Sequence, residues 1–118
     1  METAPTTRQQ KIARQLQRDL AEILQRDCAE IFRGLLLTVT AVRVSPDFGY
    51  AKIYVSVFPF ERNEEVIEKL TSNNWAIRKA LGSRIKHQLK VVPEIEFFLD
   101  DSLEYIEGID RAIKRGEE

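Results

Sequence analysis

Residues 38–57 read TVTAVRVSPDFGYAKIYVSV, and this stretch decides the fold. Its first part, Thr38–Val44, is rich in the β-branched residues that suit strands. In its second part, from Tyr50 to Val57, apolar residues alternate with more polar ones, which is typical of a strand with one buried face. Five residues with turn chemistry, Ser45–Gly49, join the two parts. The stretch therefore predicts an antiparallel hairpin.

A long amphipathic helix is expected before the hairpin. Thr6 or Thr7 can cap it, with a glutamine three positions later in the spacing of a capping box. Apolar residues then recur at helical intervals and cover one side of the helix. These residues are Ile12, Leu16, Leu20, Ile23, Leu24 and Ile31. Gly34 ends the region.

A broken helical region should follow the hairpin. Its first helix begins near Asn63, with two glutamates in the first turn, where the helix dipole favours them. Four poor helix formers at positions 71–74 predict a kink or a short break. A further helix is expected from about Trp75 to Lys90, and Pro93 separates it from the next element.

A third strand and a tail complete the pattern. Apolar residues alternate with glutamates in the stretch 94–99, which predicts a strand. Ser102 is placed to cap a final helix, and we expect residues 1–6 and about 103–118 to be flexible or peripheral. The chain of 118 residues has the length of one domain, so we treat residues 1–118 as a single domain.

The composition excludes several classes of protein. With 43% hydrophobic and 31% charged residues, the chain is globular rather than disordered. No apolar run approaches the roughly 20 residues of a membrane helix, and the start lacks an apolar signal segment. A lone cysteine, Cys28, cannot form an internal disulfide, and one Cys with one His is too few for a structural zinc site. We expect a cytoplasmic protein without membrane contact, metal or cofactor.

The charge is unevenly distributed along the chain. The segment Lys69–Pro93 holds six Lys or Arg and no Asp or Glu, whereas the net charge is −1, so the remainder carries −1 − 6 = −7. Concentrated positive charge on a small domain is typical of a surface that binds nucleic acid or another polyanion. On the expected helix, three lysines fall within a narrow arc facing away from the apolar stripe. They are Lys79, Lys86 and Lys90, with His87 beside them and Arg78 and Arg84 nearer the edges.

A second basic group lies in the first half of the first helix, where the helix dipole prefers acids. It consists of Arg8, Lys11, Arg14 and Arg18. Binding of a polyanion would explain why bases stand at this unfavourable place. For both basic groups, the simpler alternative is a helix face that is only exposed to solvent.

The order helix, strand, strand, helix, helix, strand is that of the type II KH fold, and local sequences narrow the match. The chain resembles the ribosome-binding factor A family over most of its length. The residues that carry the resemblance are Val42–Asp47, Tyr50–Ser56, Ile77-Arg78, Leu81-Gly82, Arg84-Ile85, Val92–Ile95, Phe97-Phe98 and Asp100–Ser102.

The resemblance implies an α+β fold in which a three-stranded sheet carries helices on one face. It also implies a bacterial factor that binds the free small (30S) ribosomal subunit near the 3′ portion of 16S rRNA. Such proteins act late in maturation and are linked to processing of the precursor's 5′ end and to growth in the cold. They are not enzymes, and nothing in the sequence requires a dimer. The expected partners are 16S rRNA and neighbouring ribosomal proteins.

The sequence departs from the family pattern at two places. The family marks the break between its second and third helices with a small residue, any residue and Gly, whereas this chain has Ser72-Asn73-Asn74. The stretch from Gly82 to Pro93 is also about two residues longer than in many relatives, which extends either the helix or the following loop.

KH domains clamp single strands with a GxxG loop, and this chain has none. Its nearest match, Gly82-Ser83-Arg84-Ile85, fails at the fourth position. We therefore expect docking on folded rRNA through basic helix faces, with contacts to phosphate that position the protein without reading sequence. The expected RNA-binding residues are Arg8, Lys11, Arg14, Arg18, Arg78, Lys79, Arg84, Lys86, His87 and Lys90.

Several alternatives remain open from the sequence. Trp75 either stacks on a base or, more simply, packs at the edge of the core. Acidic residues at 100–104 either bind Mg²⁺ or serve the start of a helix, and the second is simpler. The chain from Glu94 onward holds nine acids and three bases, so a protein adaptor with an acidic contact surface is the competing function.

Overall fold

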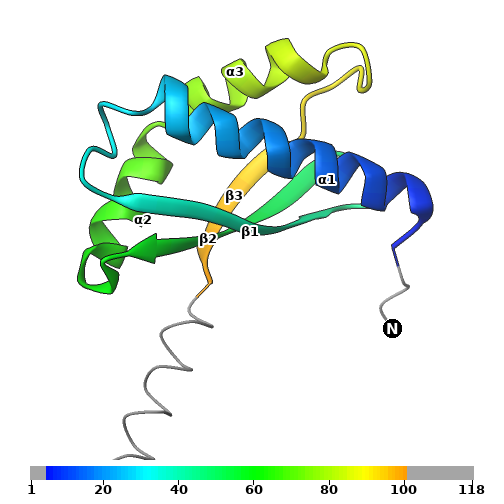
Figure 1. Cartoon of the computed structure of the whole chain (residues 1–118). Coiled ribbons are helices and arrows are strands. Elements are labelled where there is room, and N and C mark those ends of the chain that lie inside the picture. The colour runs from blue at the N-terminus through cyan, green and yellow to red at the C-terminus, as the bar shows by residue number, and fades with distance from the viewer. Residues whose placement is uncertain (1–4, 101–118) are drawn as a thin grey trace, which may run out of the picture.

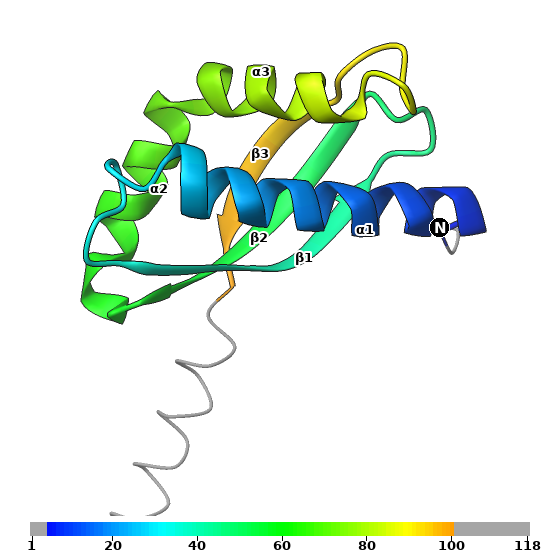
Figure 2. The same ribbon diagram turned by 45° about the horizontal axis from the view of Figure 1, so that its top comes forward.

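The computed structural model of the chain describes residues 5–100, which form a three-stranded mixed sheet and three α-helices (Figure 1). Helices α1 and α3 lie over one face of the sheet, with α2 at the end where β2 stops (Figures 1 and 2). This is the α+β arrangement that the sequence predicted. The elements are α1 (Thr7–Glu22), β1 (Leu36–Val44), β2 (Tyr50–Phe58), α2 (Asn63–Ser72), α3 (Asn74–Ile85) and β3 (Glu94–Leu99).

The predicted hairpin is confirmed. Strands β1 and β2 are antiparallel, and β3 lies parallel to β2 on its other side, so that β2 is central. The turn is held by Asp47, whose carboxylate Oδ1 accepts hydrogen bonds from Ser45 Oγ (2.7 Å) and from the Gly49 amide (3.0 Å). These bonds, that from Ser45 foremost, lower the pKa of Asp47. The turn also contacts the start of β3, since the Glu94 amide donates to the Gly49 carbonyl.

The core lies between the sheet and the helices. The apolar face of β2 is buried along its whole length, as the alternating pattern predicted. Helix α1 contributes Leu16 and Leu20 and α3 contributes Ile77 and Leu81, all with 0–1% of their surface exposed. Each Å² of apolar surface removed from water contributes about 25 cal/mol of stability. The packing of the helices on the sheet is therefore the main source of stability. Two glutamines of α1 add polar ties to β1, since Gln9 Nε2 donates to the Val44 carbonyl and Gln17 Nε2 to the Val39 carbonyl.

The first helix ends earlier than the sequence indicated. The predicted capping box between Thr6 and Gln9 is present, but α1 stops at Glu22 and continues as a π-helical segment over Ile23–Asp27. On a continued helix Phe32 would point roughly 140° away from the middle of the apolar stripe, at about 100° per residue. Instead the chain turns after Asp27, and Phe32 is only 4% exposed. The gain from burying this ring offsets the loss of helical hydrogen bonds.

The helix expected from about Trp75 to Lys90 is also shorter. The break between α2 and α3 is a single residue, Asn73, and α3 ends at Ile85. Because β3 runs parallel to β2, the chain must return to the Tyr50 end of the sheet, and segment 86–93, which begins with a turn, leads from the end of α3 into β3. Leu89 turns into the core within it.

The prediction that Lys79, Lys86 and Lys90 share one helical arc is therefore wrong. Lys79 lies on α3, whereas Lys86 and Lys90 lie on the loop that follows it. The stretch between Gly82 and Pro93 contains the end of α3 and a loop of eight residues, 86–93.

Parts of the predicted organisation fall outside the described residues. These are the helix capped by Ser102, the segment 103–118 and most of residues 1–6. Within residues 5–100, no helix has the length and apolar character needed to span a membrane.

Candidate nucleic-acid interface

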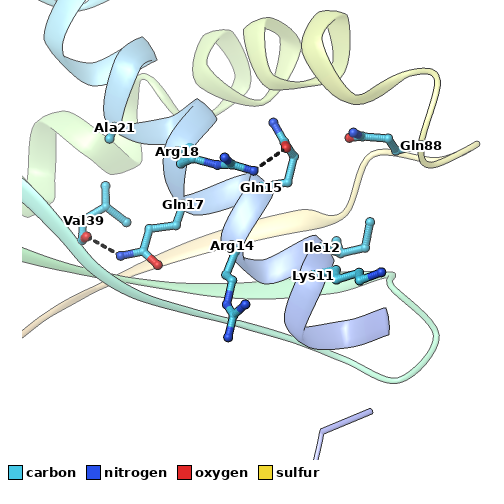
Figure 3. A pocket seen from close by; sticks show the side chains of 9 residues that line it. All are labelled: Lys11, Ile12, Arg14, Gln15, Gln17, Arg18, Ala21, Val39 and Gln88. Carbon is cyan, nitrogen blue, oxygen red and sulfur yellow. Dashed lines mark hydrogen bonds between the residues drawn. The ribbon is translucent and has the colours of Figure 1, made fainter. Parts of the chain in front are cut away.

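A groove along the outer side of α1 holds three of the predicted basic residues. Figure 3 shows Lys11, Arg14 and Arg18 on successive turns of the helix, with Gln88 reaching toward them from the loop after α3. The groove has a volume of about 890 Å³. Arg18 is oriented by its neighbour, since its Nη2 donates to Gln15 Oε1 at 3.0 Å. All three cations are exposed, so their charges are available to a ligand.

A second hollow of about 450 Å³ joins the start of α1 to the loop after α3. Arg8 lies on one side, with its guanidinium 4.9 Å from the centre of the Phe48 ring in the hairpin turn. Lys86, His87 and Lys90 line the other side. Gln88 borders both this hollow and the groove on α1, so the two adjoin. Tertiary folding thus joins the two basic groups that are separated in the sequence.

A third hollow of about 560 Å³ lies between α3 and the same loop. It contains Arg78 and Lys79 from the helix and shares Lys90 and Val91 with the second hollow. We call the cationic residues and the histidine of the three adjoining hollows the basic band. Its members are Arg8, Lys11, Arg14, Arg18, Arg78, Lys79, Lys86, His87 and Lys90, nine of the ten predicted residues.

The basic band carries little negative charge. Among the described residues that line the three hollows, Asp47 is the one acid, and its carboxylate is occupied by Ser45 and the Gly49 amide. The band is therefore a strongly positive surface made by α1, α3 and the loop 86–93.

Arg84 is the predicted residue that lies outside the three hollows. Its Nη1 is 2.6 Å from Glu22 Oε2 and 3.8 Å from Asp19 Oδ1, so it joins α3 to α1. The hydrogen bond between Arg84 and Glu22 raises the pKa of Arg84 and lowers the pKa of Glu22. Asp19 is itself buried and accepts a hydrogen bond from Gln15. With its charge matched by two carboxylates, Arg84 holds two helices together.

Arg78 has a dual position. It lines the third hollow, but its Nε donates to the Pro93 carbonyl at 3.0 Å and its Nη2 to the Val92 carbonyl at 2.7 Å. These bonds fasten the end of the loop 86–93 to α3. Arg78 thus adds charge to the basic band while most of its contacts stabilise the fold.

Trp75 and the tyrosines of β2 lie in different surroundings. The simpler interpretation of Trp75, a place at the edge of the core, is wrong, because 72% of its surface is exposed beside the third hollow. Tyr50 and Tyr54 lie on the sheet face away from the core, where Tyr50 donates to Glu96 and Tyr54 stacks on Phe98. Gln88 and Val91 also line the hollows, and their only signal in the sequence was their place in the acid-free segment.

The lone cysteine and the acidic residues are the candidates for catalytic or metal chemistry. Cys28 is buried, and burial raises the pKa of its thiol. Within residues 5–100, no three His, Cys, Asp or Glu side chains are grouped to hold a metal ion. Asp101 and Glu104, named for the Mg²⁺ alternative, lie outside that range.

Comparisons with known proteins give one consistent result. Residues 8–113 match the family model described as ribosome-binding factor A. The protein of this name from Christiangramia forsetii is 46% identical over 114 residues, which cover 96% of this chain and 87% of the relative. That from Flavobacterium psychrophilum is 42% identical over 109 residues, covering 92% and 84%.

Solved structures agree with the sequence matches. The crystal structure of ribosome-binding factor A from Thermus thermophilus superposes with a TM-score of 0.66 at 31% identity, covering 77% of this chain and 94% of the other. A homology model of the Thermus thermophilus protein, fitted into an electron cryo-microscopy map of its complex with the 30S subunit, gives 0.62 at 31% identity, covering 75% and 91%. With its fold, its sequence and its length all matching, this chain belongs to the ribosome-binding factor A family.

Proposed function

We propose that the chain binds the free small ribosomal subunit and promotes its late maturation, including processing of the 5′ end of the 16S precursor. The observation that carries the proposal is the basic band, in which nine cationic or histidine side chains from α1, α3 and the loop 86–93 face adjoining hollows. A related protein has been fitted into a map of a complex with the 30S subunit, which supports the same partner here.

The mode of binding follows from the chemistry of the band. Exposed lysines and arginines bind phosphate oxygens wherever folded RNA presents them, so that the shape of the RNA supplies the specificity. Neither acid–base catalysis nor a cofactor enters this function. We infer that the chain works as one domain, since α1, the sheet and α3 share one core, and we propose that it acts as a monomer.

The direct test is to reverse the charge of Lys79, Lys86 and Lys90 by substitution with Glu. Binding to isolated small subunits should weaken. The log–log salt dependence should become shallower by up to roughly 0.7–0.9 for each phosphate that the variant no longer neutralises. A matched control changes Arg26, Arg33 and Arg43, three exposed arginines outside the hollows, to Glu. Equal weakening by both variants would mean that net charge alone matters, not the basic band.

The maturation role needs its own experiment. A bacterium that lacks its own ribosome-binding factor A should accumulate precursor 16S rRNA, most strongly in the cold. Expression of this chain should reduce the precursor, whereas the variant with Glu at positions 79, 86 and 90 should not. Restored growth with persistent precursor would separate subunit binding from 5′-end processing.

The competing function is a protein adaptor with an acidic contact surface. One observation favours it: Glu94 and Glu96 are exposed on β3, which is an edge strand of the sheet within the described residues. Edge strands offer free backbone groups to a partner. Subunit binding that survives the change of Lys79, Lys86 and Lys90 but disappears when Glu94 and Glu96 become Lys would support the adaptor instead.

A further inference from the structure

Large exposed apolar side chains form two pairs on the surface, and one of these pairs lies in the basic band. Within the described residues, these side chains are Leu36, Phe58, Trp75 and Val91, with 61%, 60%, 72% and 69% of their surface exposed. Leu36 and Phe58 are register partners at the end of the β1–β2 ladder. Trp75 and Val91 come from α3 and from the loop after it, yet both line the third hollow. Single exposed apolar residues are common, but a pair around one concavity indicates a binding site.

The charges around this pair are all positive. Lys79 lies one helical turn after Trp75, and its Nζ is 5.1 Å from the centre of the indole ring. This cation–π contact holds the lysine beside the ring and orients both side chains. Lys90 stands on the loop side of the hollow, and no Asp or Glu of the described residues lines it. A ligand that matches the site has a flat apolar surface with negative charge next to it.

A nucleotide whose base is unpaired has this chemistry. We propose that the third hollow takes one unpaired base of the bound RNA, stacked on Trp75, while Lys79 and Lys90 contact the phosphates on either side of that base. The inference rests on the proposed function and adds to it a contact that phosphates alone do not make. An acidic peptide with an aromatic residue would match less well, because the hollow is continuous with the rest of the basic band.

The site selects an unpaired base rather than a particular sequence. Every base has a π-face, so stacking on an aromatic side chain tolerates all four bases. A base inside a duplex is covered by its neighbours and has to leave the stack to reach the ring. The exposed edge of Val91 would then contact the stacked base from the loop side. Folded rRNA offers such bases at bulges and loops.

The chain carries its own probe for this test, because Trp75 is its one tryptophan. A short single-stranded RNA should quench the emission of Trp75. The same strand annealed to its complement, at equal phosphate concentration, should quench it far less. Equal quenching by both forms at equal occupancy would overturn the stacking site, since phosphates would then be the whole ligand.

Affinity for protein-free 16S rRNA gives the second readout. Trp75→Ala should lower it about 5- to 150-fold, the range expected for one stacked base, and Trp75→Phe should retain most of it. Phe58→Ala is the matched control, because it removes a similarly exposed aromatic side chain from outside the basic band. Unchanged affinity of Trp75→Ala overturns the stacking site and leaves the proposed function intact. Failure of the wild-type chain to bind either rRNA or small subunits overturns both.

Discussion

At the scale of single residues, basic side chains that look alike in the sequence have different tasks. Lys79 and Lys86 are exposed, whereas the guanidinium of Arg78 binds two backbone carbonyls and that of Arg84 binds Glu22. Arginine is the residue suited to such structural contacts, because its planar group donates several hydrogen bonds in fixed directions. The positive charge of the acid-free segment is thus divided between exposed side chains, which we propose bind RNA, and side chains that hold the fold together.

Replacing Arg78 by Lys should separate these two tasks. The charge remains, but an ammonium group cannot donate to Val92 and Pro93 with the geometry of a guanidinium. The free energy of unfolding should fall by about 1–3 kcal/mol, as measured by urea denaturation, while the salt dependence of RNA binding stays the same. Lys79→Ala, on an exposed neighbour, should change stability by less than about 0.5 kcal/mol. A fully stable Arg78→Lys variant would show that these bonds contribute little.

The acid sensitivity of the fold should depend on Glu65. Hydrogen bonds from Arg62 and from Lys69 lower the pKa of this carboxyl from 4.5 to about 2. Because the folded state favours the ionised form, the resulting stability is fully present above pH 4.5 and is lost as the pH falls toward 2. Between pH 4.5 and about 2, the melting temperature should fall more steeply for the wild type than for Glu65→Gln. Parallel curves for the two proteins would contradict this assignment.

At the scale of elements, the points where helices end decide the shape of the site. Helix α3 stops at Ile85, and its side at Gly82 lies directly against the loop that returns to β3. A Cβ at position 82 would lie 2.8 Å from Val92 Cγ2, closer than carbon atoms pack. Glycine is therefore required here by the close approach of the loop, although alanine is the better helix former.

Gly82→Ala sets these two effects against each other. Alanine in a helix gains about 0.5–1 kcal/mol over glycine, whereas overpacking of a core typically costs about 1–3 kcal/mol. We expect a net loss of about 0.5–2 kcal/mol in the free energy of unfolding, because the branched side chain of Val92 has little freedom to move.

The double variant Gly82→Ala with Val92→Ala gives the control, measured by chemical denaturation beside both single variants. Val92→Ala removes the clashing methyl groups. Gly82→Ala should therefore lower the free energy of unfolding less in the Val92→Ala background than in the wild type. A single variant more stable than the wild type would mean that the loop moves aside without cost.

At the scale of the whole molecule, the basic band exists because three distant parts of the chain meet. The start of α1, the hairpin turn and the loop 86–93 surround the second hollow, which connects the other two. A single RNA molecule can therefore contact the groove on α1 and the hollow beside α3 at the same time. This continuity distinguishes one extended surface from two independent patches.

Neutralisation of the two ends of the band should test this continuity. One variant changes Lys11, Arg14 and Arg18 to Gln, another changes Lys79, Lys86 and Lys90 to Gln, and a third combines all six changes. Each triple variant should make the salt dependence of 16S rRNA binding shallower, and the combined variant should show the sum of both reductions. If the combined variant matches one triple variant, only that end of the band contacts RNA.

The local pattern by itself determined which elements form and which side of each is buried. The alternation in residues 50–57, the capping box at Thr6 and the acid-free segment after Lys69 depend on neighbours in the chain, so they can be read without coordinates. The resemblance to the family rested on the same short stretches. Nine of the ten predicted RNA-binding residues do lie in the basic band.

Only the tertiary structure decided where α1 and α3 end and that Arg8 lies across a hollow from Lys86. It also decided that Trp75 is exposed and that Arg84 is paired with Glu22. A straight helix through Lys90 was the favoured local prediction, but the parallel return to β3 and the burial of Leu89 outweigh helix propensity. These outcomes depend on packing between segments far apart in the chain, whose free energy no local pattern contains.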